Sequence, residues 1–476
     1  MRFKKIFSAQ RKRRHEKQAG YVSGQDGSGR SAHTISLAIR TPSFWISAVG
    51  SVVLWTLFLF WCFTHHANRA GYAAAFVCTA LFELMCLRFV PRWMCFWSAK
   101  EEPVPGDERA GKNDGKIFLG LLMVFLLVQI LVYLFRLAQG DSAGFLPGLD
   151  FWLNLDTGRY FSIAEQGYAP NENLVFFPAY PLLIRFLNMF TGKSMYSALL
   201  ASALLYAGSG CVMYRLLKLD FSEKTALHTI KYMAILPAAF FFSAPMSESL
   251  FLFFCVCCAY FARSGKWTLG CVFGALAAFT RSLGVLTVAF LVLEAVSGAV
   301  RDGTGRKQWV RRFLAILLVP LGTLAYLWIN YRVTGNPFKF MEYEARVWGQ
   351  SMGFFFGVAA MQVDNALAML GTPYYRDALG IWLPNAAYSF SVLILMAVAA
   401  KKLRPSYTAW FIVYYVIAMG ASFLISAPRY LVAALPIYPA LAQVITDRKF
   451  AIAFDLASIG LALYYLFALT MLWGVY

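Results

Sequence analysis

Residues 150–181 read Asp150-Phe-Trp-Leu-Asn-Leu-Asp156-Thr-Gly-Arg159-Tyr160-Phe-Ser-Ile-Ala-Glu165-Gln-Gly-Tyr168-Ala-Pro-Asn-Glu172-Asn-Leu-Val-Phe176-Phe177-Pro178-Ala-Tyr180-Pro181. This stretch is rich in polar and aromatic side chains, and it is too polar to cross a bilayer. Apolar stretches flank it at about 116–137 and 196–217, and each has the length of a membrane-spanning helix. The sequence therefore predicts a polar loop between two transmembrane helices.

The whole composition is typical of a membrane protein. The chain has 476 residues, of which 59% are hydrophobic and only 14% are charged, whereas soluble domains carry about 25% charged residues. Apolar windows recur from residue 42 onward, so the fold class is expected to be all-α, a polytopic transmembrane helical bundle. Spans are expected at about 43–63, 70–90, 116–137, 196–217, 228–243, 247–263, 266–280, 283–299, 311–331, 383–400, 407–426, 429–446 and 450–474.

The charge distribution predicts the topology. The net charge is +19, and the basic residues concentrate in short connecting loops, which is the positive-inside pattern rather than a nucleic-acid surface. Thirteen spans with the N-terminus inside satisfy every basic cluster and place residues 138–194 and 332–382 outside. We expect four regions: a disordered basic tail touching anionic membrane lipid, two accessory spans with a linker, a catalytic core and a final span, at 1–40, 41–115, 116–446 and 447–476.

The first outer loop contains a short amphipathic helix. Asp156 is a good N-cap, and Thr157 to Gln166 can form a helix that Gly167 ends. At helical spacing, Asp156, Arg159 and Tyr160 share one face. One interpretation is purely structural, with Asp156 capping the helix and pairing with Arg159. The other is that this face presents a functional carboxylate.

Further polar groups occur at predicted outer ends of spans, where isolated ions are costly unless they are paired or functional. Glu248 lies in the first turn of a helix after Pro245, which capping by Ser247 could also explain. Arg281 and Arg429 either snorkel to the interface or bind phosphate, because a guanidinium matches phosphate oxygens bidentately. Glu294 lies deep in a span and is interpreted as structural.

Several short elements together resemble one family. They are Asp156-x-x-x-Tyr160 with Glu165-x-Gly-Tyr168, Phe176-Phe177-Pro178-x-x-Pro181-Leu, Ser247-Glu248-Ser249, Thr280-Arg281-Ser282-x-Gly284, Gly335-Asn336-Pro337-x-x-Phe340 and Arg429-Tyr430. This pattern resembles the PIG-V family, which comprises GPI mannosyltransferase II and its bacterial relatives among the GT-C glycosyltransferases. The likeness runs from about residue 116 to 446.

The resemblance implies transfer of mannose from a polyprenyl- or dolichyl-phosphate mannose donor to a glycan or glycolipid acceptor. A sugar hydroxyl is a poor nucleophile, so the reaction needs a general base, and Asp156 is predicted to be that base with Arg159 or Glu165 orienting it. Arg281 or Arg429 would neutralise the leaving phosphate. No cofactor or metal is expected. Substrate contacts are predicted at Arg159, Tyr160, Phe177, Glu248, Arg281, Asn336, Arg429 and Tyr430.

Two alternatives remain open at this point. A GT-C enzyme could transfer another lipid-linked sugar, such as arabinose or glucose. A lipid or glycolipid transporter (flippase) would use intramembrane Arg and Glu differently and predicts inverted repeats, of which no obvious halves are visible. The sequence contains no Asn-x-Ser/Thr sequon, which favours a bacterial cell membrane over the endoplasmic reticulum membrane of a eukaryote.

Overall fold

Helices make up the described part of the chain. The computed structural model describes residues 41–98, 113–169, 171–301, 303 and 305–475. These residues form α-helices joined by short 3-10 or π turns, and none of them belongs to a strand. The all-α prediction is confirmed for this part, whereas the predicted tail at 1–40 lies outside the described residues.

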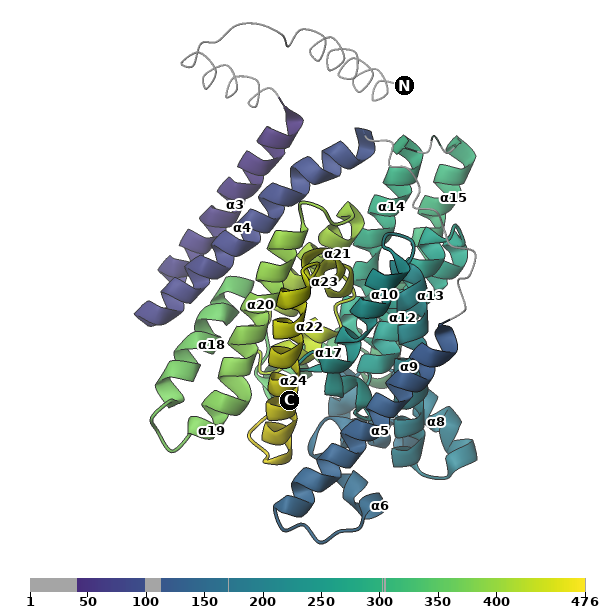
Figure 1. Cartoon of the computed structure of the whole chain (residues 1–476), viewed down its shortest axis with the longest axis vertical. Helices are drawn as coiled ribbons and strands as arrows, with labels where there is room; N and C mark the ends of the chain where they lie inside the picture. The colour runs from purple at the N-terminus through teal and green to yellow at the C-terminus, as the bar shows by residue number, and fades with distance from the viewer. Residues whose placement is uncertain (1–40, 99–112, 170, 302, 304, 476) are drawn as a thin grey trace, which may run out of the picture.

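Eight segments of the described chain are long and apolar enough to cross a membrane, and they lie along one another in a bundle (Figure 1). Five are single helices: α3 (Pro42–Thr64), α4 (Arg69–Ser98), α5 (Asp114–Ala138), α9 (Ser194–Leu217) and α24 (Arg448–Thr470). Three are composite: η4 (Ser282–Leu286) with α14 (Thr287–Arg301), α15 (Arg306–Ile316) with α16 (Val319–Thr334), and α19 (Tyr375–Asp377) and η5 (Ala378–Trp382) with α20 (Leu383–Ala399). The chain is a multi-pass membrane helical bundle.

The other five predicted spans differ from full-length helices. Three are short: α12 (Glu248–Arg263) has 16 residues, and α13 (Trp267–Thr280) and α21 (Pro405–Ala418) have 14 each, against about 20 for a helix that crosses the hydrocarbon core. Two predictions of continuous spans, at 228–243 and 429–446, were wrong. Pro237 and Pro436 interrupt them, which leaves α10 (Glu223–Ile230), α11 (Tyr232–Ile235) and η3 (Ala239–Ser243), and α22 (Ala427–Val432) and α23 (Ile437–Val444).

The second outer loop is also more structured than predicted. Within 332–382, the helix α18 (Phe355–Met369) lies beside α4 and α20 (Figure 1). The ring of Phe356 lies 5.7 Å from the ring of Phe58 in α3, and Asp364 Oδ2 accepts a hydrogen bond from Asn68 N at 2.8 Å. Part of this stretch is therefore a helix of the bundle rather than a loop, because side chains of α18 pack against α3 and α4.

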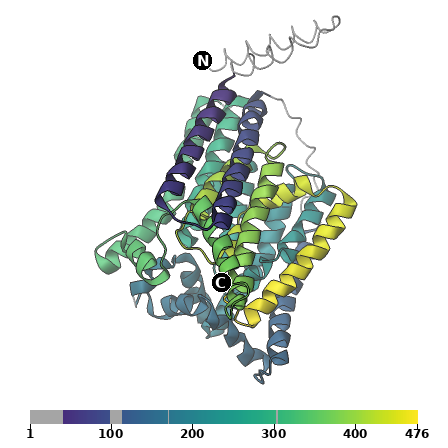
Figure 2. The same cartoon turned by 90° about the vertical axis from the view of Figure 1, so that its left-hand side faces the viewer.

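The loop after α5 covers one end of the bundle. It contains α6 (Phe145–Gly148), η1 (Leu149–Asn154), α7 (Thr157–Gln166), η2 (Asn171–Val175) and α8 (Ala179–Thr191). In Figures 1 and 2 this blue segment lies at the end of the molecule opposite the start of α3. The short helix α17 (Lys339–Trp348) from the second loop packs against η2. The predicted short helices of the outer loops are thus present.

A separate buried ion-pair network surrounds Glu294 in α14. Arg404 donates to both of its carboxylate oxygens, at 2.6 and 2.8 Å, and Ser406 Oγ donates at 2.6 Å. Arg263 lies 3.8 Å from Glu294 and pairs with Asp220 at 2.7 Å. These contacts join α12, α14 and the start of α21, and they agree with the structural interpretation of Glu294.

We expect Glu294→Ala to destabilise the protein by about 3–5 kcal/mol, because it leaves the largely buried guanidinium of Arg404 without its carboxylate partner. The readout is the midpoint of thermal unfolding in detergent, compared with that of Glu342→Ala, whose exposed pair with Lys339 is worth little. Equal midpoints for the two variants would contradict the structural role.

Candidate active site

Four charged side chains form one connected network where the loop after α5 meets the helix ends. Glu248 Oε1 accepts hydrogen bonds from Arg281 Nη1 and Arg429 Nε. Arg429 Nη1 also donates to Asp156 Oδ2 at 2.6 Å, across 273 positions of sequence. The fold thus brings together four of the residues that the sequence analysis singled out separately.

Breaks between helices position three of these side chains. Glu248 is the first residue of α12, where free backbone N–H groups favour a carboxylate. Arg281 follows the last residue of α13 in an extended conformation, with φ −153° and ψ 151°. Arg429 lies in α22, directly after Pro428 in its first turn. The ends of these short or interrupted helices therefore place charged groups inside the bundle.

Asp156 neither caps α7 nor pairs with Arg159, the two contacts that the structural interpretation predicted. Its backbone is in the αR region, with φ −62° and ψ −5°, and its side chain makes no capping hydrogen bond to α7, whereas N-cap residues typically have β-region dihedrals. Arg159 does not pair with it either, since Arg159 Nη1 donates to Asn173 Oδ1 at 3.4 Å. Arg429 is the cationic partner of Asp156.

Burial decreases along the network towards Asp156. The side chain of Glu248 is 0% exposed and that of Arg429 is 8% exposed, whereas that of Asp156 is 30% exposed. Asp156 is thus the more exposed of the two carboxylates. No three His, Cys, Asp or Glu side chains of the described residues are placed to hold a metal ion. The network offers guanidinium donors for an anion and one accessible carboxylate for a proton.

Tyr160 and Tyr430 contact the network from two sides. The hydroxyl of Tyr160 lies 3.0 Å from Ser247 Oγ, and burial raises the pKa of Tyr160 to about 12. The guanidinium carbon of Arg281 lies 4.8 Å from the centroid of the Tyr430 ring, at cation–π distance. Both tyrosines therefore lie beside the network, and their contact with substrate remains a prediction.

Aromatic rings extend from Tyr160 towards α17. The ring centroid of Phe176 lies 5.3 Å from that of Tyr160, and Trp348 lies 5.7 Å from Phe176. The predicted Phe177 points to a neighbouring ring instead and stacks on Tyr326 at 3.8 Å. Phe176, rather than Phe177, is the ring in contact with Tyr160.

Asn336 forms a turn rather than part of the network. Its Oδ1 accepts a hydrogen bond from Phe338 N at 2.9 Å, and Gly335 before it has φ +73°, which favours glycine. Among the interactions of the described residues, Asn336 has none with the four network residues. Its predicted contact with substrate remains a prediction.

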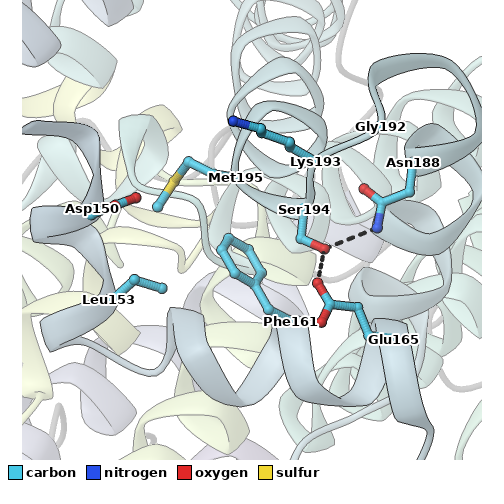
Figure 3. Close-up of a pocket in the computed structure, with 9 residues that line it drawn as sticks. All are labelled: Asp150, Leu153, Phe161, Glu165, Asn188, Gly192, Lys193, Ser194 and Met195. Carbon is cyan, nitrogen blue, oxygen red and sulfur yellow. Dashed lines mark hydrogen bonds between the residues drawn. The ribbon is translucent and has the colours of Figure 1, made fainter. Parts of the chain in front are cut away.

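Glu165 lines a different cavity, of about 480 Å³, between η1, α7, α8 and α9 (Figure 3). Its carboxylate accepts a hydrogen bond from Ser194 Oγ at 2.5 Å, and Asn188 Nδ2 donates to the same hydroxyl at 2.9 Å. Asp156 and Glu165 are nine positions apart, which places them on opposite faces at about 100° per residue. The structure therefore pairs Asp156 with Arg429 and not with Glu165 or Arg159.

The catalytic prediction for Glu165 has a direct test. Because its carboxylate faces away from Asp156, we expect Glu165→Gln to lower glycosyl transfer less than tenfold, far below the loss from a missing general base. The measurement is the initial rate of transfer by purified protein in nanodiscs. A loss as large as that of Asp156→Asn would restore Glu165 to the catalytic machinery.

One residue near the site was not predicted. It is Glu344 in α17, which belongs to the second outer loop and was not among the predicted site residues. Burial, and secondarily the charge of Asp156, raises the pKa of Glu344 to about 7. The spacing of Phe340, Glu344 and Trp348 on one helical face was the available signal.

Comparison with known proteins identifies the region around this site. Residues 142–334 match the family model described as Mannosyltransferase (PIG-V). The mouse protein GPI alpha-1,6-mannosyltransferase 2 is 29% identical over 229 residues, which are 44% of this chain and 44% of the mouse protein. Its namesake in Cricetulus griseus is 31% identical over 174 residues, covering 33% of this chain and 34% of that protein. The chain thus spans less than half the length of these relatives.

Two solved structures match parts of the chain at low sequence identity. ArnT from Cupriavidus metallidurans, solved bound to undecaprenyl phosphate, has a TM-score of 0.43 and 17% identity over 71% of this chain and 62% of that chain. The oligosaccharyltransferase AglB from Archaeoglobus fulgidus has a TM-score of 0.33 and 13% identity over 62% of this chain and 48% of that chain. The family match includes Asp156, Glu248 and Arg281. Over residues 142–334, the chain is thus similar to the mannosyltransferases of the PIG-V family.

Proposed function

We propose that the chain is a membrane glycosyltransferase of the GT-C type. It moves a mannosyl residue from polyprenyl- or dolichyl-phosphate mannose to an extracytoplasmic glycan or glycolipid acceptor, with Asp156 as the general base. The observation that carries this proposal is the network of Asp156, Arg429, Glu248 and Arg281 within a PIG-V-like chain.

The proposed step uses the charges of this network. An acceptor O–H bond breaks and its proton goes to the Asp156 carboxylate, while the acceptor oxygen forms a bond to the anomeric carbon of the donor. The bond between that carbon and the phosphate oxygen breaks, and the electron pair leaves with the lipid phosphate. The negative charge on the phosphate increases from about −1 towards −2 during this step, so positively charged donors beside the phosphate stabilise the transition state.

Arg429 links these two events because it already contacts Asp156. When Asp156 takes the proton, its negative charge disappears and its pair with Arg429 weakens. The guanidinium is then available to the leaving phosphate, whose oxygens it can bind bidentately. Glu248 and Arg281 keep Arg429 in place during this change.

The direct test is transfer by purified protein in nanodiscs. The protein is incubated with polyprenyl-phosphate [³H]mannose and a lipid extract of cell membranes, and labelled products are separated from the donor. Radiolabelled polyprenyl-phosphate glucose and arabinose are run in parallel. A new labelled product formed from the mannose donor supports the proposal. A labelled product formed only from the glucose or arabinose donor would show that the enzyme transfers that sugar instead of mannose. Movement of intact donor across the membrane without transfer would indicate a transporter.

A further inference from the structure

A pair of buried hydroxyl groups joins the first turn of α7 to the start of α12. The hydroxyl of Tyr160 lies 3.0 Å from Ser247 Oγ, and the two residues are only 5% and 1% exposed. The same Ser247 oxygen accepts a hydrogen bond from Arg281 Nη1 at 3.4 Å. Ser247 also directly precedes Glu248 in the chain. One hydroxyl group therefore contacts both α7 and the charged network.

Ser247 does not have the structural role that its position suggests. It is the N-cap residue of α12, where a serine hydroxyl typically accepts a hydrogen bond from a free backbone N–H group. Its backbone is instead in the αR region, with φ −75° and ψ −5°, and its side chain makes no capping hydrogen bond. The hydroxyl is thus used for contacts with side chains of other elements rather than for the helix that it precedes.

Two side-chain hydrogen bonds of the described residues join the first turn of α7 to the network, and they differ in charge. Asp156 pairs with Arg429 at 2.6 Å, and Tyr160 pairs with Ser247. The backbone N–H of Tyr160 donates to Asp156 O at 3.3 Å, so both side chains project from the same helical turn. The first contact depends on the negative charge of Asp156, whereas the second joins two neutral groups.

We propose that Ser247 is a positioning residue, which holds the turn that carries Asp156 in place while Asp156 is protonated. This inference rests on the proposed function, in which proton uptake by Asp156 weakens its ion pair with Arg429. During that interval, the neutral hydrogen bond between Tyr160 and Ser247 still joins the turn to the network. The turn thus remains where Asp156 can pair with Arg429 again once it is ionised.

This role predicts an effect on kcat rather than on KM. Before the reaction, Asp156 carries its negative charge, and its pair with Arg429 holds the turn with or without the hydroxyl pair. Once Asp156 carries the proton, loss of the hydroxyl pair leaves the turn without either contact, and small displacements at a reacting centre are costly. Burial raises the pKa of Tyr160 to about 12. Its hydroxyl therefore stays protonated up to pH 9, and the loss of kcat relative to the wild type should not depend on pH below that value.

The chain offers a second pair of buried hydroxyl groups as a matched control. The hydroxyls of Tyr180 and Ser202 lie 3.1 Å apart, and both residues are 0% exposed. The ring of Tyr180 lies 5.3 Å from that of Tyr160, and Ser202 donates to Ala244 O at 2.8 Å. In the described part of the chain, neither hydroxyl forms a hydrogen bond with the four network residues. Removing this pair should therefore lower stability without lowering transfer.

The test is a pair of double-mutant cycles. Tyr160→Phe, Ser247→Ala and their double variant are compared with Tyr180→Phe, Ser202→Ala and their double variant. Each is assayed in nanodiscs with polyprenyl-phosphate [³H]mannose and a membrane lipid extract, and its unfolding midpoint is recorded.

We expect Tyr160→Phe and Ser247→Ala each to lower kcat about tenfold, with the KM for the donor within about twofold of the wild type. Their double variant should lose no more than either single variant, because all three lack the same hydrogen bond. The control variants should keep kcat within about twofold of the wild type, although their unfolding midpoints fall.

Different failures have different meanings. No transfer by the wild type would overturn the proposed function itself. Wild-type transfer with kcat unchanged in Tyr160→Phe and Ser247→Ala, or with losses that multiply in their double variant, would overturn only the positioning role. Equal losses of kcat in the control cycle would show that such contacts serve stability alone, which also contradicts the role. If Ser247→Ala does not fold, Tyr160→Phe decides, and an unchanged kcat in that variant overturns the inference.

Discussion

Asp156→Asn is expected to reduce glycosyl transfer by about 10²- to 10⁴-fold, the range that a general base contributes. The amide has nearly the same shape as the carboxylate but cannot accept a proton from the acceptor hydroxyl. Arg429 loses one partner and keeps Glu248, so the fold should persist. The measurement is the initial rate of label transfer under saturating donor, with thermal unfolding recorded for the same preparation.

Asp150→Asn is the matched control for this variant. Asp150 belongs to the same loop and is exposed, but it lines the cavity that contains Glu165. We expect its transfer rate to stay within about twofold of the wild type, because a surface change away from the network has little effect. Unchanged transfer by folded Asp156→Asn would remove Asp156 from the role of base.

Arg429→Gln is expected to have the second largest effect, because this side chain joins both carboxylates of the network. Loss of one positive donor at the leaving phosphate should lower kcat by about 10²- to 10³-fold. Truncating one member of a buried ion-pair network also costs about 3–5 kcal/mol of stability, although Glu248 keeps Arg281 as its partner. Transfer rate and unfolding midpoint are measured together.

Two further variants separate charge from geometry at this position. Arg429→Lys keeps the positive charge but not the planar pair of donors that reaches Glu248 and Asp156 together. Relative to Arg429→Gln, we therefore expect it to recover part of the stability but little of the transfer rate. Arg185→Gln removes an exposed cation from α8 and should leave the transfer rate and the unfolding midpoint unchanged. Full activity in Arg429→Gln would contradict a role for Arg429 at the phosphate.

Local patterns in the sequence were sufficient for the all-α class and for eight of the thirteen predicted spans. Runs of about 20 apolar residues can satisfy their backbone groups in lipid only as helices, and eight predicted spans are present as such segments. The same patterns located Asp156, Glu248, Arg281 and Arg429, since charged groups beside apolar runs are conspicuous. The resemblance to PIG-V, carried by short local elements, agrees with the match over residues 142–334.

The partners of these groups depended on the tertiary structure. Helical periodicity describes neighbours within one turn or two, so it suggested Arg159 as the partner of Asp156. The actual partner is 273 positions away. The breaks before Arg429 and the packing of α18 against α4 likewise follow from contacts between distant segments.

The sequence by itself determined that this protein is a helical membrane bundle with charged groups at the ends of particular helices, because hydropathy and helical spacing are local properties. Only the tertiary structure decided that Arg429 links Asp156 to Glu248, and that Glu165 lines a cavity that does not include Asp156. The physical reason is that burying a charge requires a partner, and the packing of distant helices selects which partner that is.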